Sequence, residues 1–287
     1  MSKVSIRFYN DREVRAIWDE ANAKWYFSIV DIVAAITDSP RPRVYWGTLK
    51  SRQKEKHGQL YSKCIQLKLV STDGKRYATD CFAQEDIADV VKTIPNKKAI
   101  HFLDWLTYSE NSIDGQSKTK AYTLMQSNLV DMEEVGTVKS LQQIHAYLFG
   151  GLYDFAGQIR TKTISKGNFT FCLAQYLDNA LQQIEQMPQN TFDEIVDKYV
   201  EMNVAHPFME GNGRSTRIWL DLILKKQLGL CVDWSRIGKN DYLNAMIVSH
   251  TDSSGIRSLL RGALTDKIND RETFMKGIDY SYYYEQE

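Results

Sequence analysis

Side chains able to do chemistry are concentrated in one short stretch of the chain. It runs His206-Pro207-Phe208-Met209-Glu210-Gly211-Asn212-Gly213-Arg214-Ser215-Thr216-Arg217. An imidazole has an unperturbed pKa of about 6.5 and can accept a proton near neutral pH. Mg²⁺ is commonly held by one or two carboxylates together with phosphate oxygens. The stretch therefore contains a candidate general base, His206, and a candidate metal ligand, Glu210.

The predicted elements on either side place this stretch at the start of a helix. Apolar residues at helical spacing predict helices over 192–205 and 214–226. Glycines 211 and 213 let backbone N–H groups converge on an anion without a Cβ in the way, and the helix adds the positive end of its dipole. Arg214 and Arg217 share one face of the first turn and can bind phosphate oxygens. Alone, such a histidine or arginine pair is usually structural; together they predict a polyphosphate site.

The stretch resembles the signature of the Fic family, HxFx(D/E)GNGRxxR, and matches it at every specified position. Members of this family typically transfer AMP from ATP to a hydroxyl group of a target protein. The resemblance implies that His206 takes the proton from the attacking hydroxyl and that Glu210 holds Mg²⁺ between phosphates. It also implies that Phe208 anchors the loop in the core.

The nucleotide-binding residues implied by the same resemblance follow the glutamate. The backbone of Gly211, Asn212 and Gly213, the Asn212 side chain and Arg214 would hold the α- and β-phosphates. Arg217 would reach the γ-phosphate. Relatives that phosphorylate instead carry Lys where this chain has Gly213, which disfavours that variant.

Composition indicates an ordinary globular protein. The 287 residues are 43% hydrophobic and 25% charged, values usual for one or two folded domains. We expect no membrane role, because no apolar run approaches the roughly 18 residues that a span needs. The four cysteines are scattered, and no signal peptide is visible at the start. These features predict reduced thiols and a cytoplasmic location.

Residues 1–108 are predicted to form a small α+β domain. Alternating apolar residues predict a β-meander over 4–27 and a hairpin over 67–79, with helices at 28–35, 43–54, 85–91 and 97–106. The layout is similar to the BRO-type N-terminal domain of phage and viral antirepressors. The residues that resemble it are Phe8…Glu13-Val14-Arg15, Trp25-Tyr26-Phe27…Asp31-Ile32 and Trp46…Leu49-Lys50.

Relatives of that domain are associated with DNA binding, and residues 1–108 hold 18 Lys and Arg against 13 Asp and Glu. One basic stretch comprises Arg41, Arg43, Lys50, Arg52, Lys54 and Lys56, near Tyr45 and Trp46. Such a cluster can bind phosphates. A solvated helix face above a buried Trp46 explains the same pattern. DNA or another partner is therefore an open expectation for this domain.

Residues 109–287 are predicted to adopt an all-α Fic helical fold with one β-hairpin. Residues 107–120 lack apolar periodicity and indicate the boundary between the two domains. Helices are expected at 121–129, 138–149, 174–186, 239–249 and 256–268. Strands 159–164 and 169–172 flank a glycine-containing turn. In Fic proteins such a flap clamps the target segment as an added strand, which implies docking by Thr163, Ile164, Ser165, Lys166, Gly167 and Asn168.

The tail, about residues 271–287, resembles the inhibitory helix of the C-terminally autoinhibited Fic class. That class has the pattern (S/T)xxxE followed by a small residue, and Ser281 and Glu285 match it. The resemblance implies that Glu285 pairs with Arg217 and keeps the γ-phosphate from seating productively. Gln286 departs from the pattern. A frayed polar tail is the alternative.

These expectations together predict an autoinhibited protein adenylyltransferase. Its co-substrate would be ATP with Mg²⁺, and its target a protein with a Ser, Thr or Tyr hydroxyl. Two alternatives stay open: a Fic enzyme that transfers or removes a different group, and a DNA-binding regulator whose Fic domain senses nucleotide. Oligomer-controlled inhibition occurs among relatives, so a homo-oligomer is open as well.

Overall fold

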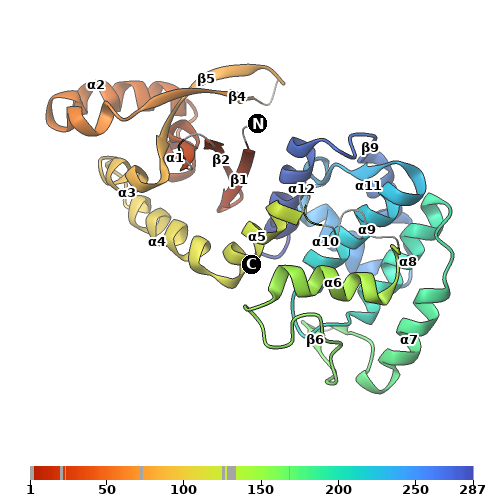
Figure 1. Cartoon of the computed structure of the whole chain (residues 1–287). Helices are drawn as coiled ribbons and strands as arrows, with labels where there is room; N and C mark the ends of the chain where they lie inside the picture. The colour runs from red at the N-terminus through yellow and green to blue at the C-terminus, as the bar shows by residue number, and fades with distance from the viewer. Residues whose placement is uncertain are drawn as a thin grey trace. The chain divides into compact units, whose positions relative to one another are not determined.

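The computed structural model describes residues 3–19, 22, 24–71, 74–124, 127, 134–167 and 169–286. The chain divides into two compact units, Met1–Ser112 (unit 1) and Ile113–Glu287 (unit 2), which are described separately (Figure 1). None of the helices in the described residues combines the length and apolar character needed to cross a bilayer.

Five antiparallel strands form the sheet of unit 1. They are β1 (Lys3–Tyr9), β2 (Arg12–Asp19), β3 (Lys24–Ser28), β4 (Ile65–Val70) and β5 (Arg76–Ala83), in the order β1-β2-β3-β5-β4. The expected meander and hairpin are thus one sheet, joined where Phe27 of β3 pairs with Phe82 of β5. Alternation along β2 sends Val14 and Ala16 to one face and Ile17 to the other.

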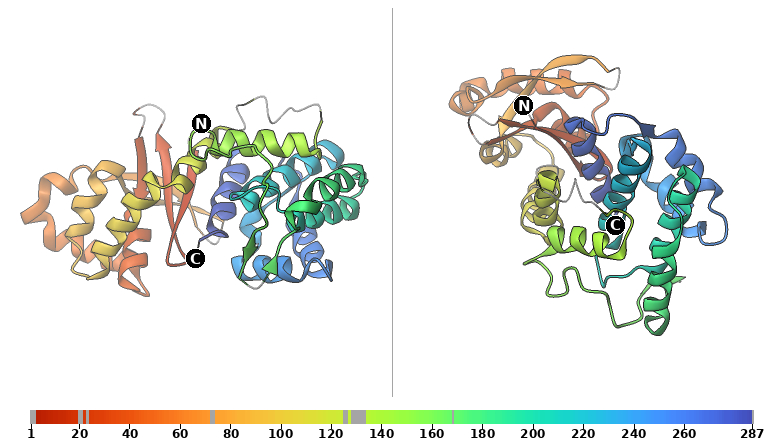
Figure 2. Two further views of the ribbon diagram at one scale, coloured as in Figure 1. Left: turned by 90° about the horizontal axis from the view of Figure 1, so that it is seen from below. Right: turned by 45° about the vertical axis from the view of Figure 1, so that its right-hand side comes forward.

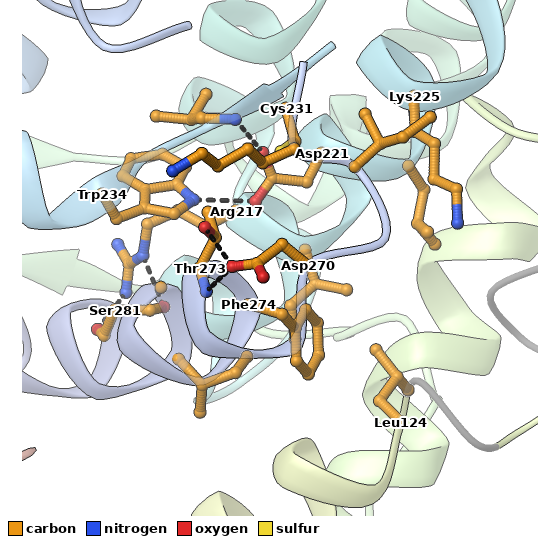
Figure 3. A pocket seen from close by; sticks show the side chains of 17 residues that line it. Leu124, Arg217, Asp221, Lys225, Cys231, Trp234, Asp270, Thr273, Phe274 and Ser281 are labelled. Carbon is orange, nitrogen blue, oxygen red and sulfur yellow. Dashed lines mark hydrogen bonds between the residues drawn. The ribbon is translucent and has the colours of Figure 1, made fainter. Parts of the chain in front are cut away.

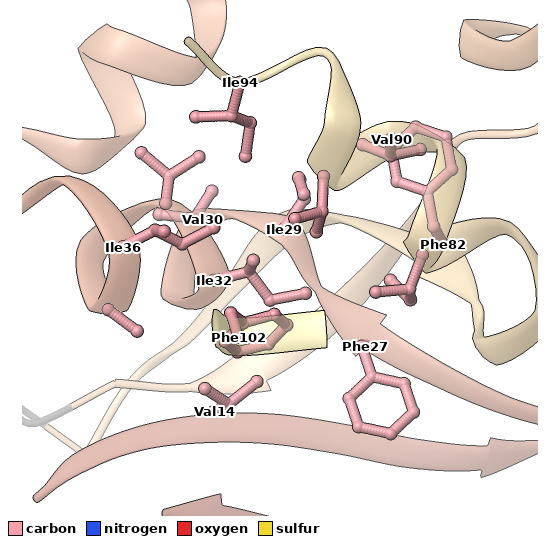
Figure 4. Close-up of a cluster of buried hydrophobic side chains, with 14 of the residues drawn as sticks. Val14, Phe27, Ile29, Val30, Ile32, Ile36, Phe82, Val90, Ile94 and Phe102 are labelled. Atoms are coloured by element: carbon pink, nitrogen blue, oxygen red, sulfur yellow. The ribbon is translucent and has the colours of Figure 1, made fainter. Parts of the chain in front are cut away.

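Four helices pack on the face of the sheet that carries Val14 and Phe27. They are α1 (Ile29–Thr37), α2 (Pro42–Tyr61), α3 (Gln84–Lys92) and α4 (Lys98–Asn111). Figure 4 shows their apolar side chains meeting those of the strands, with Ile32 and Phe102 above Val14. The burial of this continuous apolar cluster is what gives unit 1 its own core.

The basic stretch of unit 1 lies on α2. Trp46 is buried, and its indole N–H donates to the Asp80 carboxylate at 2.8 Å. Lys50 pairs with the same carboxylate at 2.9 Å. Other basic residues of the stretch are exposed, namely Arg41, Arg43, Arg52 and Lys56; the Lys54 side chain lies outside the described residues. One helix therefore carries the buried tryptophan and several exposed basic residues.

Unit 2 is mainly helical. Its helices are α5 (Ile113–Thr123), α6 (Val138–Phe149), α7 (Ala174–Gln186), α8 (Phe192–Ala205), α9 (Asn212–Leu228), α10 (Lys239–Val248), α11 (Ser254–Gly262) and α12 (Arg271–Tyr283). Helix α9 contacts α6, α8 and α12, and α12 also contacts α5 (Figure 2). Buried residues are found all round α9, including Ile218, Trp219 and Leu224, which makes α9 the centre of the unit.

The two units meet between Ser112 and Ile113, inside the segment 107–120 where the domain boundary was expected. The segment itself is mostly helical: α4 continues to Asn111, and α5 begins at Ile113. One other expectation for this region was wrong. The expected helix over 256–268 ends at Gly262, and β9 (Leu264–Thr265) then pairs with β8 (Cys231–Val232). The pairing explains the break, because Leu264 turns from the α11 helix to lie opposite Val232. Part of the helix expected over 121–129 lies outside the described residues.

Candidate active site

The loop between α8 and α9 begins at a strained histidine. Helix α8 starts with a capping box, in which the Thr191 hydroxyl accepts from the Glu194 amide and the Glu194 carboxylate accepts from the Thr191 amide. It ends at His206, whose backbone adopts a left-handed conformation with φ 51°. This conformation costs a residue with a Cβ on the order of 1 kcal/mol, so surrounding contacts must hold it.

Two contacts orient the His206 side chain. Its Nδ1 lies 3.1 Å from the carbonyl oxygen of Asn203, and its ring stacks on Phe171 with centroids 3.6 Å apart. Because a carbonyl only accepts, Nδ1 carries the proton and Nε2 keeps its lone pair. Burial lowers the pKa of His206 to about 4. The ring is therefore neutral at pH 7, with an Nε2 that can take a proton from a hydroxyl group.

The loop is closed by hydrogen bonds between Phe208 and Asn212. The Asn212 side chain accepts from the Phe208 amide and donates to the Phe208 carbonyl, both at 2.8 Å. Phe208 is fully buried and stacks on the His145 ring, with centroids 3.8 Å apart. Gly211 has φ 80°, and a Cβ there would come within 2.5 Å of the Phe149 ring. Glycine is thus required, and both polar side-chain atoms of Asn212 shape the loop.

Glu210 lies at the rim of the loop, with its side chain 58% exposed. Its Oε1 accepts from the Gly211 amide and from Arg214 Nη2, each at 2.9 Å. Its hydrogen bonds within the described part of the chain use Oε1, which leaves Oε2 for water or a metal. Nowhere in the described ranges do three or more His, Cys, Asp or Glu residues gather as a metal site. A lone exposed carboxylate still fits Mg²⁺, which completes its shell with phosphate and water.

Arg214 is a fixed, buried cation at the start of α9. Its Nη1 donates to the carboxylate of Asp114 at the start of α5. Its guanidinium lies 4.9 Å from the centroid of the Phe149 ring and 5.6 Å from that of Tyr282. Burial opposes its charge, but the combined attraction of Asp114, Tyr282, Glu285 and Glu210 outweighs burial and raises the pKa of Arg214. Nothing in the sequence pointed to Asp114, which lies in the segment where the domain boundary was expected.

Arg217 is enclosed by the C-terminal helix. It is 2% exposed, and its Nη2 lies 2.6 Å from Glu285 Oε1 and 2.7 Å from the Ser281 carbonyl. Its Nε donates to the Ser281 hydroxyl at 2.8 Å, and its Nη1 donates to the Tyr242 hydroxyl at 3.2 Å. Burial opposes ionisation of Glu285, but Arg217 outweighs it and lowers the pKa of that carboxyl. The structure therefore brings Arg217, Ser281 and Glu285 together as an ion pair with two further hydrogen bonds.

The end of the chain is packed rather than frayed. Helix α12 ends at Tyr283, and Glu285 lies in the following turn, where its amide donates to the Tyr282 carbonyl at 3.2 Å. The Tyr284 hydroxyl donates to two backbone carbonyls, those of Trp234 and Ile237. Glu287, the last residue of the expected inhibitory segment, lies outside the described residues.

A polar face of α5 holds α12. The Lys118 ammonium lies 2.7 Å from Asp279 Oδ1, and the Tyr122 hydroxyl donates to the same oxygen. The Tyr282 hydroxyl donates to Ser117 at 3.0 Å. Asp279 is fully buried, and the Lys118 side chain is 9% exposed. A buried charge is tolerated only when it is paired, so this network fixes the position of α12.

The hairpin expected as a flap lies beside His206. Regular pairing is limited to β6 (Ser165–Lys166) with β7 (Phe169–Thr170), so the strands are shorter than expected. Phe171 stacks on His206 directly after β7. The expected docking residues Thr163, Ser165, Lys166 and Gly167 are exposed and Ile164 is half-buried; Asn168 lies outside the described residues.

Arg160 ties the base of this hairpin to the end of α8. Its Nε donates to the His206 carbonyl at 2.7 Å, and its Nη2 donates to the carbonyls of Ala205 and Cys172 at 3.0 and 2.5 Å. Positive charge at a helix C-terminus is favourable. Arg160 therefore helps to hold the strained backbone of His206, a task that the residue pattern did not reveal.

A small cavity lies behind Arg217, between α9, β8 and α12. It has a volume of about 60 Å³, and Figure 3 shows Asp221, Trp234 and Phe274 around it. Asp221 accepts from the Val232 amide at 2.9 Å and from the Trp234 indole at 2.7 Å. Burial outweighs these bonds and raises the pKa of Asp221 to about 7. The carboxyl thus joins α9 to the segment on which Tyr284 is anchored.

Comparison with known proteins assigns the segment that contains this loop to a family. The model described as "Fic/DOC family" matches residues 136–224. Residues 136–224 are therefore similar to this family, and they contain the motif on which the resemblance was based.

Two relatives match part of the chain. "Protein adenylyltransferase VbhT" of Bartonella schoenbuchensis is 32% identical over 48% of this chain and 32% of that protein. "Probable protein adenylyltransferase Fic" of Escherichia coli strain K12 is 33% identical over 37% of this chain and 58% of that protein. This chain thus spans less than two thirds of the length of either relative. The solved N-terminal FIC domain of Bep8 from Bartonella sp. 1-1C is 17% identical, covers 55% of this chain and 85% of its own, and has a TM-score of 0.48.

Proposed function

We propose that unit 2 transfers AMP from ATP to a hydroxyl side chain of a target protein, and that α12 restrains this activity. The observation that carries the proposal is the neutral His206 ring, oriented by Asn203 with Nε2 unprotonated, next to the N-terminus of α9. The hydroxyl oxygen attacks the α-phosphorus, the bond from that phosphorus to the α,β-bridging oxygen breaks, and pyrophosphate leaves. His206 Nε2 accepts the hydroxyl proton.

The first turn of α9 and its two arginines would bind the nucleotide. Backbone amides from Gly211 to Gly213 form a helix N-terminus, which favours anions. Arg214 would bind the α- and β-phosphates, and Arg217, one helical turn further on, would bind the γ-phosphate. Mg²⁺ held by Glu210 would neutralise charge on the leaving pyrophosphate. The names of the two relatives, both protein adenylyltransferases, support AMP as the transferred group.

The hairpin next to His206 would orient the target. Because strand addition pairs backbone with backbone, it accepts many sequences and still fixes the distance of one side chain from the histidine. The exposed edge at Ser165 and Lys166 and the stacking of Phe171 on His206 support this role.

Autoinhibition would follow from the occupation of Arg217. Glu285 and Ser281 take its Nη2 and Nε atoms, so a γ-phosphate must displace them to reach the guanidinium. Gln286 replaces the small residue of the related pattern, yet its backbone carbonyl accepts from Lys239. That contact supports a docked tail despite the departure.

A second proposal concerns unit 1, as a BRO-type domain that contacts DNA phosphates through α2. The specific observation in its favour is the exposed position of Arg41, Arg43, Arg52 and Lys56 on one helix. Gel-shift titration of the full chain should show affinity that falls steeply with salt. Affinity unchanged by replacement of these four residues by Gln would contradict the proposal.

The decisive experiment for the enzymatic proposal uses Glu285→Gly with α-labelled ATP, Mg²⁺ and a cell lysate. We expect a labelled protein band, stronger than with the unchanged chain. The matched control is Glu285→Gly with His206→Ala, which should bind ATP and transfer nothing. Transfer that survives His206→Ala would exclude His206 as the base. Binding of ATP without any transfer by Glu285→Gly would favour nucleotide sensing.

A further inference from the structure

His145, on α6, contacts the loop between α8 and α9. His145 is fully buried, and its Nε2 lies 2.9 Å from the carbonyl oxygen of Glu210. The Gly157 amide donates to His145 Nδ1, also at 2.9 Å. Because an amide only donates and a carbonyl only accepts, the proton is on Nε2 and the lone pair is on Nδ1. Both ring nitrogens are therefore used, one for the loop and one for the approach to the hairpin.

This arrangement uses the ring as one donor and one acceptor. A proton on Nδ1 would point at the Gly157 amide hydrogen, so the hydrogen bond from Gly157 would be lost. The ring is also clamped between neighbours: it stacks on Phe208 at 3.8 Å and lies 4.8 Å from Phe149. His145 is thus held in a single orientation.

The contacts around Glu210 leave its peptide group with few other restraints. The side chain is more than half exposed, and its Oε1 accepts from the next amide and from Arg214. The Glu210 carbonyl is fixed by His145. Close packing below the loop allows little adjustment, since a Cβ on Gly157 would come within 2.8 Å of the Ala146 side chain. The hydrogen bond from His145 therefore fixes the backbone from which the Glu210 side chain extends, while Gly211 and Arg214 hold the carboxylate itself.

We propose that His145 is a positioning residue, which holds the Glu210 peptide so that the carboxylate meets the Mg²⁺ of a bound nucleotide. It touches neither nucleotide nor metal and acts through Glu210, as hydrogen-bond partners of metal ligands do. The proposal rests on the function proposed above, because it requires Glu210 to bind Mg²⁺.

The test compares two amides in the Glu285→Gly chain. In His145→Gln the amide nitrogen reaches the place of Nε2 and keeps a donor for the Glu210 carbonyl. In His145→Asn the shorter side chain can keep only the acceptor for Gly157. Both lose the ring stacked on Phe208, so the loss of packing is shared. The measurement is the Mg²⁺ concentration that half-saturates binding of a non-hydrolysable ATP analogue, by calorimetry.

We expect His145→Asn to raise that Mg²⁺ concentration by about 10–100-fold, and His145→Gln to stay within about threefold of its parent. Equal shifts in the two variants would mean that His145 only fills space. This readout is independent of catalysis: a parent that binds nucleotide with Mg²⁺ but transfers no AMP overturns the proposed function and leaves the comparison intact.

A second measurement needs no variant at position 145. Nitrogen NMR of the unchanged chain should show a neutral His145 with the proton on Nε2 at pH 6. A proton on Nδ1 would exclude the bond to Glu210 and overturn the proposal, even if the amide variants fail to fold.

Discussion

The buried pair between α5 and α12 gives the sharpest stability prediction. In Asp279→Asn the remaining carbonyl can still accept from Tyr122, but Lys118 loses the charge that lies 2.7 Å from its ammonium. Removal of one partner of a buried ion pair costs about 3–5 kcal/mol. Each kcal/mol lowers the melting temperature of a domain of this size by about 2–4 °C. The melting temperature of unit 2 should therefore fall by about 6–20 °C.

The free-energy cost of the buried Lys118 charge in Asp279→Asn can also be reduced if α12 detaches from α5. Because Arg217 is enclosed by Ser281 and Glu285 of that segment, release exposes the guanidinium. We therefore expect more AMP transfer from Asp279→Asn than from the unchanged chain at 25 °C, measured with α-labelled ATP. Calorimetry of the same samples supplies the melting temperature.

The matched control is the double variant Lys118→Met with Asp279→Asn. Replacement of both charges removes the buried ammonium that has lost the Asp279 charge, so most of the lost stability should return. A single variant that melts within about 1 °C of the unchanged chain, with transfer also unchanged, would show that the pair does not hold α12.

Three further predictions concern single side chains. Burial raises the pKa of Asp221 to about 7, against about 4 in an unfolded chain. Between these pH values only the folded protein keeps the proton, so the unfolding free energy of unit 2 should fall as the pH rises from about 4 to 7. Asp221→Asn should flatten that pH dependence, measured by urea titration. Gly211→Ala should lower the melting temperature and slow transfer, because its φ of 80° and the Phe149 ring leave no room for a Cβ. Asp31→Asn should lower the unfolding free energy of unit 1 by about 2 kcal/mol in urea, since Arg15 donates to both oxygens of that carboxylate.

Local patterns in the sequence predicted the elements that bury an apolar face. Helix α8 repeats apolar residues at helical spacing and ends at the motif, and the meander over β1 to β3 alternates apolar and polar residues. The position of the motif between two helices followed from the same periodicity. The Arg217, Ser281 and Glu285 cluster, implied by resemblance, is formed in the structure.

Helix α5 shows why other elements and contacts were not predicted from the sequence. Its buried face consists of Ser117, Lys118, Ala121 and Tyr122, so it has no apolar stripe to read. Those polar groups are satisfied by residues more than 150 positions away, such as Asp279. The roles of His145 and Arg160 were missed because their partners are backbone groups, which leave no mark on the sequence.

Gly213 brings the start of α9 and the tail into close contact. A Cβ added there would collide with Glu285 Oε1 and lie 3.0 Å from Arg217 Nη1. Any other residue at this position would therefore have to push the Glu285 carboxylate away from the Arg217 guanidinium. The ion pair that joins the tail to α9 thus depends on a missing side chain as well as on the two charged ones.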